Sequence, residues 1–233
     1  MAHPFFSIAI PTYGYNGKGV EFLEHNLTII ESQTFKDFEV IISDHSTDDT
    51  ILAIFNKWSD RLNIKYFRNE NGRGIISPNI NNAMRQCTGK WIKVLFQDDF
   101  LFDENALKIQ YQFINFNSEI KWLMTAFHHS NDGVTYYNAF IPRWNNLIWT
   151  GYNTMGCPSG LTMKNESLIF FDEGLNWLMD VDYYKQLFDR YGEPKILNDF
   201  TVVNRTWGNR LTDTINQELK DKEEKMVYLK YGK

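Results

Sequence analysis

Cysteine is scarce in this chain: its 233 residues include only Cys87 and Cys157. These two residues lack the spacing of a zinc site and cannot build a disulfide framework, which excludes the small disulfide-stapled proteins. Such low cysteine usage favours a reducing compartment.

Long apolar runs are also missing. No stretch approaches the ~20 residues that a membrane-spanning helix needs. Residues 1–4 have neither the basic segment nor the apolar segment of a secretory signal. We therefore expect a cytoplasmic protein without a transmembrane segment.

Positive charge is in short supply as well, because 24 Lys and Arg residues face 29 Asp and Glu residues and the formal net charge is −5. Nucleic-acid binding relies on a basic surface, so we expect no nucleic-acid partner. An acidic chain that handles a phosphorylated substrate needs a metal ion or local Arg and Lys side chains to offset the repulsion.

Aromatic residues are abundant instead, at 16%, within an apolar fraction of 43%. Large rings fill a dense core, and they also form platforms on which sugars stack. Both uses stay open on composition alone.

Buried-looking apolar runs alternate with amphipathic segments along the first hundred residues. This alternation predicts βαβ units with right-handed crossovers and an α/β fold, a Rossmann-like doubly wound, mainly parallel sheet flanked by helices. The predicted strands cover residues 5–10, 38–43, 64–67 and 91–96, and the predicted helices cover 20–33, 78–86 and a segment that starts at 46–49.

The second half is less regular and predicts a mixed sheet. We expect helices at 105–116, 180–190 and 212–229, a hairpin of strands 121–127 and 134–140 around the turn 131–133, and strands at 161–163 and 196–203. No repeat or linker interrupts the chain, so we predict a single domain over 1–233, with a nucleotide-binding half (1–100) and an acceptor half (101–233).

Two adjacent carboxylates, Asp98 and Asp99, follow the apolar run 91–96 directly. A buried strand that stops at paired acids delivers negative charge to the sheet edge where α/β proteins bind ligands. Hard oxygen ligands there suit Mg²⁺ or Mn²⁺, which in turn can hold a diphosphate. The alternative for such a pair is a solvated turn after a strand.

Polar groups also follow the first two predicted strands. Pro11 and the backbone of Thr12 and Tyr13 are placed to hold a planar base, and Asp44 is placed to accept a hydrogen bond from it. Ordinary loop chemistry at the end of a strand is the alternative for each residue.

Several motifs occur in a characteristic order: residues 7–13, Asp44-x-Ser46-Thr47-Asp48, Asn71-x-Arg73-Gly74, Asn81-x-Ala83, and Gly89-Lys90-Trp91-Ile92 followed by Gln97-Asp98-Asp99. Together they resemble the family-two inverting glycosyltransferases with the GT-A fold. The resemblance implies a metal-dependent enzyme that moves a hexose from a UDP-sugar, with UDP-glucose as the first guess, to an acceptor hydroxyl. The acceptor, whether a glycan, a lipid-linked sugar or a protein, stays open.

The resemblance also implies roles for residues. It assigns the nucleotide to Pro11, Thr12, Tyr13, Asp44, Arg73, Asn81, Gln97 and Asp98, and it assigns the metal, Mn²⁺ or Mg²⁺, to Asp99 with Asp98. Many members carry a further acid where this chain has Phe96, so Gln97 or Asp98 is expected to supply that ribose contact.

In the second half, residues 156–163 resemble the segment that lines the donor sugar, which points to Ser159 and Gly160. Residues 177–184 resemble the acidic motif that opens a helix, which makes Asp180 the expected general base; a helix N-cap is its alternative role. Asp182 is expected to hold the acceptor or the helix start, and Trp177 to stack on a sugar.

Three arginines, Arg73, Arg205 and Arg210, are candidates to neutralise phosphates, and each also suits a solvated surface. No histidine follows His129 to act as a late metal ligand, so Asn209, Arg205 or water is expected to close the site. Two other functions compete with transfer: a sugar nucleotidyltransferase, and a catalytically weak module that binds nucleotide-sugars or glycans.

Overall fold

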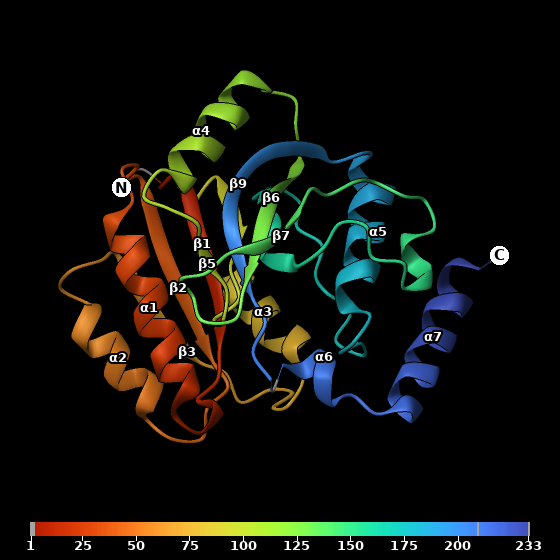
Figure 1. The fold of residues 1–233 in the computed structure, drawn as a ribbon, viewed down its shortest axis with the longest axis horizontal. Coiled ribbons are helices and arrows are strands. Elements are labelled where there is room, and N and C mark those ends of the chain that lie inside the picture. The colour runs from red at the N-terminus through yellow and green to blue at the C-terminus, as the bar shows by residue number, and fades with distance from the viewer. Residues whose placement is uncertain (1–2, 209, 233) are drawn as a thin grey trace.

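The buried apolar runs form the strands of one sheet flanked by helices (Figure 1). The structure, a computed structural model, describes residues 3–208 and 210–232. In these residues the sheet has nine strands in the order β3-β2-β1-β4-β8-β6-β9-β5, and β7 pairs with β6. The strands are β1 (Phe6–Thr12), β2 (Phe38–Asp44), β3 (Ile64–Arg68), β4 (Trp91–Val94), β5 (Phe100–Leu101), β6 (Trp122–Ser130), β7 (Tyr137–Phe140), β8 (Leu161–Lys164) and β9 (Lys195–Arg205).

The pairing of the strands differs between the two halves. Strand β1 runs parallel to β2 and β4, and β2 runs parallel to β3, with Thr12 opposite Asp44 at the ends of β1 and β2. Strand β8 is antiparallel to both β4 and β6, whereas β9 is parallel to β6 and antiparallel to β5. The predicted α/β class, with a parallel first half and a mixed second half, is confirmed.

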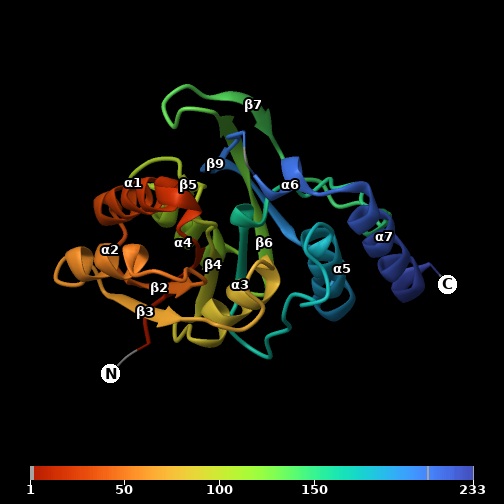
Figure 2. The ribbon, with the colours of Figure 1, turned by 90° about the horizontal axis from the view of Figure 1, so that it is seen from below.

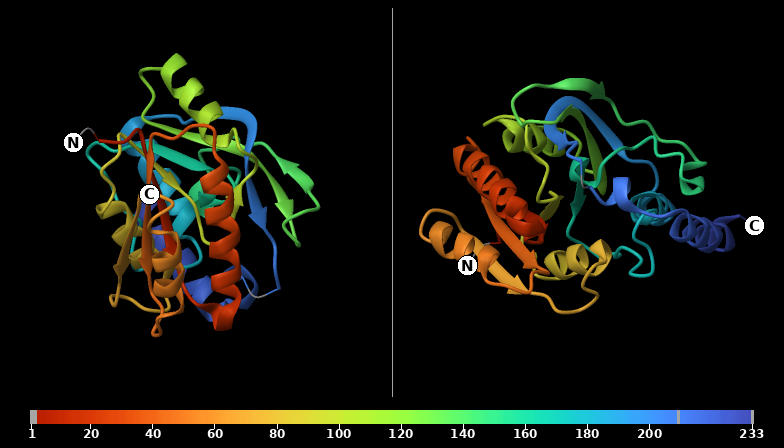
Figure 3. Two further views of the ribbon diagram at one scale, coloured as in Figure 1. Left: turned by 90° about the vertical axis from the view of Figure 1, so that its left-hand side faces the viewer. Right: turned by 60° about the horizontal axis from the view of Figure 1, so that its bottom comes forward.

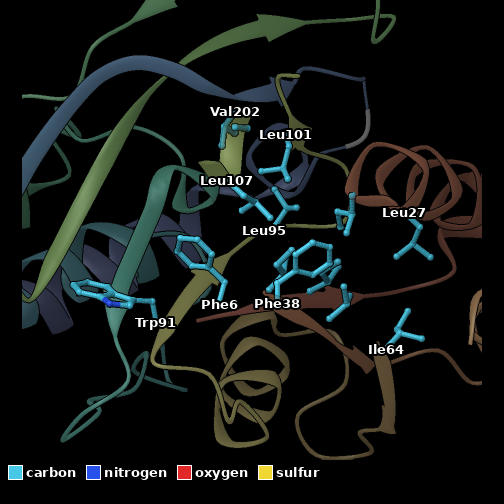
Figure 4. Packing of buried hydrophobic residues seen from close by; sticks show 14 of the residues in the cluster. Phe6, Leu27, Phe38, Ile64, Trp91, Leu95, Leu101, Leu107 and Val202 are labelled. Carbon is cyan, nitrogen blue, oxygen red and sulfur yellow. The ribbon is translucent and has the colours of Figure 1, made fainter. Parts of the chain in front are cut away.

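Helices cover both faces of this sheet (Figures 1 and 2). They are α1 (Lys18–Ser32), α2 (Thr50–Trp58), α3 (Ile76–Arg85), α4 (Ala106–Phe116), α5 (Met179–Tyr191), α6 (Leu211–Thr214) and α7 (Gln217–Tyr231). One apolar cluster joins the sheet to α1, α2 and α4, and Figure 4 shows Phe6, Leu27, Phe38 and Leu107 within it. A second cluster joins the other face to α3, α5 and α7. Helices α1 to α5 and α7 thus bury their apolar stripes against the sheet or a neighbouring helix.

The second half also reaches beyond the sheet. Strand β7 continues the β6 ribbon away from the helices, as Figure 2 and the left view of Figure 3 show. Helix α7 lies beside α5, at the end of the molecule opposite α2 (Figures 1 and 2). None of the helices among residues 3–208 and 210–232 is long and apolar enough to span a membrane.

Three boundaries differ from the sequence-based expectations for local reasons. Strand β4 ends at Val94 rather than 96 because the N–H of Phe96 donates to the Ser159 hydroxyl instead of continuing the ladder with β1. Strand β7 starts late because the Asp132 carboxylate accepts from the N–H groups of residues 134 and 135. The helix predicted at 212–229 is two helices, since Asn216 caps α7 by accepting from the N–H of Leu219.

Strand β5 was not predicted at all. It is only two residues long and pairs with β9, a partner about a hundred residues further along the chain. Such a short run carries no period that a sequence pattern can reveal.

Candidate active site

A cavity of about 440 Å³ lies where β1, β2 and β4 end. Its walls come from residues that the sequence assigned to the nucleotide and from others that it missed. The assigned residues are Pro11, Thr12, Tyr13, Arg73, Gln97 and Asp98, and the others include Tyr15, His45, Thr47, Ile76, Asn79 and Thr214. The carboxyl edge of the parallel strands therefore holds a pocket, as expected for this kind of sheet.

Hydrogen bonds tie the loops around this cavity to one another. The N–H of Tyr13 donates to the Gln97 side-chain oxygen at 2.7 Å, and the Gln97 amide donates to the carbonyl of Gly19 at 2.6 Å. A β-carbon on Gly19 would lie 1.9 Å from the carbonyl oxygen of Tyr13, so only glycine allows this approach. Gln97 thus joins the end of β1, the end of β4 and the start of α1.

Asp44 lies behind the cavity wall rather than on it. Its side chain is fully buried, and its two oxygens accept from the N–H of Ser46 at 2.8 Å and the Tyr66 hydroxyl at 2.7 Å. These bonds shape the loop that brings His45 and Thr47 to the cavity. Direct contact of Asp44 with a base stays a prediction.

On α3, Asn79 rather than the predicted Asn81 lines the cavity, and a nucleotide contact of Asn81 stays a prediction. Asn79 lines the cavity and donates to the Thr12 carbonyl at 3.1 Å. Asn81, which does not appear in the cavity wall, exchanges hydrogen bonds of 2.9 Å with the backbone of Phe171. Residues two apart on a helix point to different sides of it. The motif in the sequence does not say which side of α3 faces the cavity, so it could not identify the asparagine that lines it.

The paired acids follow the end of β4 and are held by side chains and backbone from β9 and the residues just after it. An Asp98 oxygen accepts from the Trp207 indole N–H at 3.0 Å. An Asp99 oxygen accepts from the Asn204 amide and from the N–H of Arg205, both at 2.9 Å. Burial raises the pKa of both carboxyls, and the charge of Asp98 raises the pKa of Asp99 further.

The chemistry of this pair fits a divalent cation. Both ligands are hard oxygens, and no Lys or Arg of the described residues forms an ion pair with either acid. The described residues hold no cluster of three or more His, Cys, Asp or Glu side chains suited to a metal, so a cation here needs further oxygens from a ligand or water. A diphosphate supplies such oxygens.

Of the three candidate arginines, only Arg73 lines the cavity. The Arg205 guanidinium lies over the rings of Phe22 and Phe100 and donates to the Asp98 carbonyl at 3.0 Å, so it supports the loop from behind. Arg210 forms an ion pair with Asp213 at 3.0 Å. Asn209 lies outside the described residues.

Asp180 sits in the first turn of α5, which begins at Met179, and it is therefore not the N-cap. One carboxylate oxygen accepts from the Asn153 amide at 2.7 Å, and the other accepts from the N–H of Val181 at 2.7 Å. Burial raises the pKa of Asp180 to about 6, despite these hydrogen bonds. A carboxylate with such a pKa suits general base catalysis near neutral pH.

The segment expected to line the donor sugar lies next to the paired acids. The Ser159 hydroxyl accepts from the N–H of Phe96 at 2.9 Å, and its carbonyl accepts from the buried ammonium of Lys93. Gly160 is buried with little room, because a β-carbon there would lie 3.1 Å from Met124.

Trp177 and Asp182 both contact α7, and Asp182 also contacts a residue of its own helix, α5. The Lys220 ammonium lies 5.3 Å from the ring of Trp177. The Asp182 carboxylate is fully buried and accepts from Gln186, Lys230 and Tyr231 at 2.7 to 2.8 Å. The structure thus gives Asp182 a role in holding α7 against α5, and sugar contacts for both residues stay predictions.

The mixed sheet and the helices that flank it define the class of α/β proteins with a GT-A fold. Glycosyl transferase family 2 matches residues 7–188, and the chain belongs to this family. A relative from Campylobacter jejuni is named GalNAc(5)-diNAcBac-PP-undecaprenol beta-1,3-glucosyltransferase. It is 36% identical over 99 residues, which cover 42% of this chain and 31% of the relative. The resemblance inferred from the motifs is confirmed.

Solved structures show the same fold. Staphylococcus aureus TarS 1-349 in complex with UDP-GlcNAc matches with a TM-score of 0.70 at 18% identity, over 96% of this chain and 65% of that chain. A mannosyltransferase from Pyrobaculum calidifontis, in complex with GDP-Man and Mn²⁺, matches with a TM-score of 0.62 at 16% identity, over 88% of this chain and 57% of that chain. This chain therefore spans less than two thirds of each of these three proteins.

Proposed function

We propose that residues 1–233 form a single catalytic domain that transfers a hexose from a UDP-sugar to an acceptor hydroxyl with inversion. The observation that carries this proposal is the cavity at the ends of β1, β2 and β4, with Asp98 in its wall. A binding pocket at this edge, with acids that suit a cation, is what a sugar diphosphate needs.

The nucleotide end of the cavity is aromatic and polar. Tyr13 and Tyr15 are 46% and 37% exposed, and their ring centroids lie 5.0 Å apart. Exposed rings of this kind offer a surface on which a uracil base stacks. Arg73, also in the cavity wall, would supply positive charge for a phosphate, and it now lies 3.5 Å from the Glu70 carboxylate.

The metal belongs to the proposal. Asp99 and Asp98 would hold Mn²⁺ or Mg²⁺, and the bound ion would stabilise the negative charge of the leaving diphosphate. The Mn²⁺ bound in the Pyrobaculum mannosyltransferase structure supports this choice of ion. No second protein acid is needed, because a diphosphate leaves without protonation, unlike the leaving group of a glycoside hydrolase.

Asp180 is the proposed general base. Inverting transfer requires a carboxylate that takes the proton of the acceptor hydroxyl while this oxygen attacks the anomeric carbon from the face opposite the diphosphate. The Asn153 amide holds one Asp180 oxygen, and the raised pKa keeps the group basic enough to accept the proton. Ser159, Gly160 and Trp177 remain the proposed neighbours of the sugars.

UDP-glucose is the first donor to test, because the Campylobacter relative is named a glucosyltransferase, and UDP-GlcNAc is the second, because TarS binds it. The name of the same relative makes a lipid-linked glycan the first acceptor to test, ahead of other glycans and proteins. We place the reaction in the cytoplasm, as the cysteine usage suggested.

The test is UDP release from each donor, with and without Mn²⁺ and with a lipid-linked oligosaccharide. Transfer predicts Mn²⁺-dependent UDP release that the acceptor accelerates. Binding of UDP-sugars without release would favour the binding-module alternative. Formation of a UDP-sugar and pyrophosphate from UTP and a sugar 1-phosphate would favour the nucleotidyltransferase.

A further inference from the structure

Helix α7 buries a charged side chain where a carboxylate is costly. Glu223 is 0% exposed, and no ion pair involves it among the described residues. Its two oxygens instead accept from the backbone N–H groups of Asn176, Trp177 and Leu178, each at 2.9 Å. Charge-assisted bonds of this kind are strong enough to offset the burial of the charge.

These three N–H groups lie just ahead of α5. The first N–H groups of a helix have no partner within the helix, and a negative charge is favourable there. Leu178, at the N-cap position of α5, offers no side-chain cap of its own. Glu223, 45 residues after Leu178, accepts from the N–H at this N-cap position and from the two N–H groups before it, and so caps the segment that leads into α5.

The capped segment also reaches the cavity. The Asn176 side-chain oxygen accepts from the N–H of Ile76 at 3.2 Å, and the Ser77 hydroxyl donates to the carbonyl of Leu175 at 2.7 Å. Ile76 is part of the cavity wall. Residues 175–178 therefore connect the donor cavity on one side with Asp180 on the other.

We infer that Glu223 is a positioning residue for the reaction: by capping residues 176–178 it sets the place of the Asp180 carboxylate relative to the donor cavity. This inference rests on the proposed role of Asp180. A misplacement of about 1 Å at a reacting group costs roughly 100-fold in rate, so a cap at this point has a large effect on turnover.

The charge of Glu223 also bears on the base. Burial is the main cause of the raised pKa of Asp180, and the charge of Glu223, which acts from α7, makes a smaller contribution in the same direction. The other polar groups facing Asp180 are the Asn153 amide from the preceding loop and Tyr184 from α5 itself. Removal of the Glu223 charge therefore lowers the pKa of Asp180.

Lys230 provides a matched control on the same helix. Its ammonium donates to Asp182 at 2.7 Å and so joins α7 to α5 without touching residues 176–178. Lys230→Met loosens the docking of α7 but leaves the cap intact. Glu223→Gln keeps the size of the side chain but removes its charge and one of its two acceptor atoms.

The experiment compares UDP release by wild type, Glu223→Gln and Lys230→Met across pH, with thermal unfolding of each. We expect Glu223→Gln to lower kcat at least about 10-fold, to leave KM for the donor within about twofold, and to move the acid limb of the pH profile to lower pH. Lys230→Met is expected to keep both kcat and the acid limb.

The inference is overturned if Glu223→Gln keeps the kcat and the acid limb of wild type. It is also overturned if Glu223→Gln and Lys230→Met lose kcat equally and in proportion to their loss of thermal stability. If Glu223→Gln does not fold, Glu223→Asp takes its place. The shorter side chain keeps the charge but draws the carboxylate away from the N–H groups of residues 176–178. We then expect kcat to fall and the acid limb of the pH profile to stay where it is. The proposed function fails separately, if wild type releases no UDP.

Discussion

The two halves of the molecule build their parts of the site in different ways. In the first half, the ends of parallel strands bring backbone and short loops to the cavity, as with Tyr13, His45 and Gln97. Side chains of the second half instead hold acids of the site through contacts between remote parts of the chain. Asn204 holds Asp99, at the end of the first half, across 105 residues, and Asn153 holds Asp180 across 27.

This difference has a physical origin. In a doubly wound parallel sheet, the loops that lead from strands to helices all lie at the same edge. The order and direction of the strands therefore create the pocket in the first half, without the need for particular side chains. The mixed second half has no such edge, and its groups reach the site only through particular hydrogen bonds. We therefore expect substitutions in the first half to affect mainly stability and donor binding, and those in the second half to affect mainly turnover.

The largest effect is expected at Asp180. Asp180→Asn keeps the shape but removes the base, so kcat for transfer falls roughly 100- to 10,000-fold, as for loss of general base catalysis. Binding of UDP, measured by calorimetry, stays unchanged because the cavity is intact. Full activity in this variant would remove Asp180 from the mechanism.

Removal of the metal should also abolish turnover. Dialysis against EDTA leaves the diphosphate without its cation, so UDP release falls at least about 100-fold. Mn²⁺ added back restores it. Equal rates with EDTA and with Mn²⁺ would mean that this chain stabilises the diphosphate by its own side chains.

The pH dependence tests the second half more finely. Asp180 acts as a base only when ionised, and its pKa is raised to about 6. The rate kcat/KM should therefore be flat above this pH and fall about tenfold for each unit below it. An acid limb near pH 4, the range of an unperturbed carboxyl, would show that another group is titrating.

The smallest effect on turnover is expected from Tyr66→Phe in the first half. It removes the hydroxyl that donates to the buried Asp44 carboxylate at 2.7 Å. Loss of a hydrogen bond to a charged group costs about 1.5 kcal/mol of the free energy of unfolding. Denaturant melts should show this loss while kcat stays within about twofold; a large fall in kcat would place Asp44 in direct contact with the substrate.

The sequence predicted the first half well because its signals are local. Apolar runs bounded by turns located β1, β2 and β3 to within about two residues, and the motif Gln97-Asp98-Asp99 located the acids. It did not separate Asn79 from Asn81, because that choice depends on which face of α3 meets the cavity.

In the second half, the decisive contacts are long-range and left no local signal. The partners of Asp182 lie on α7, Arg205 is buried between two phenylalanine rings, and Trp207 donates to Asp98. Composition and periodicity describe neighbours along the chain, so they cannot report contacts of this kind.

The most direct test of the account is a calorimetric titration of UDP with Mn²⁺ into wild type and Asp99→Asn. Asp99 contacts Asn204 and the backbone of Arg205, both uncharged donors, so asparagine fits the same space. We predict that wild type binds UDP and that Asp99→Asn binds it at least about tenfold more weakly, through loss of the metal. Equal affinities, or no binding of UDP to wild type, would contradict the claim that the paired acids anchor a sugar diphosphate.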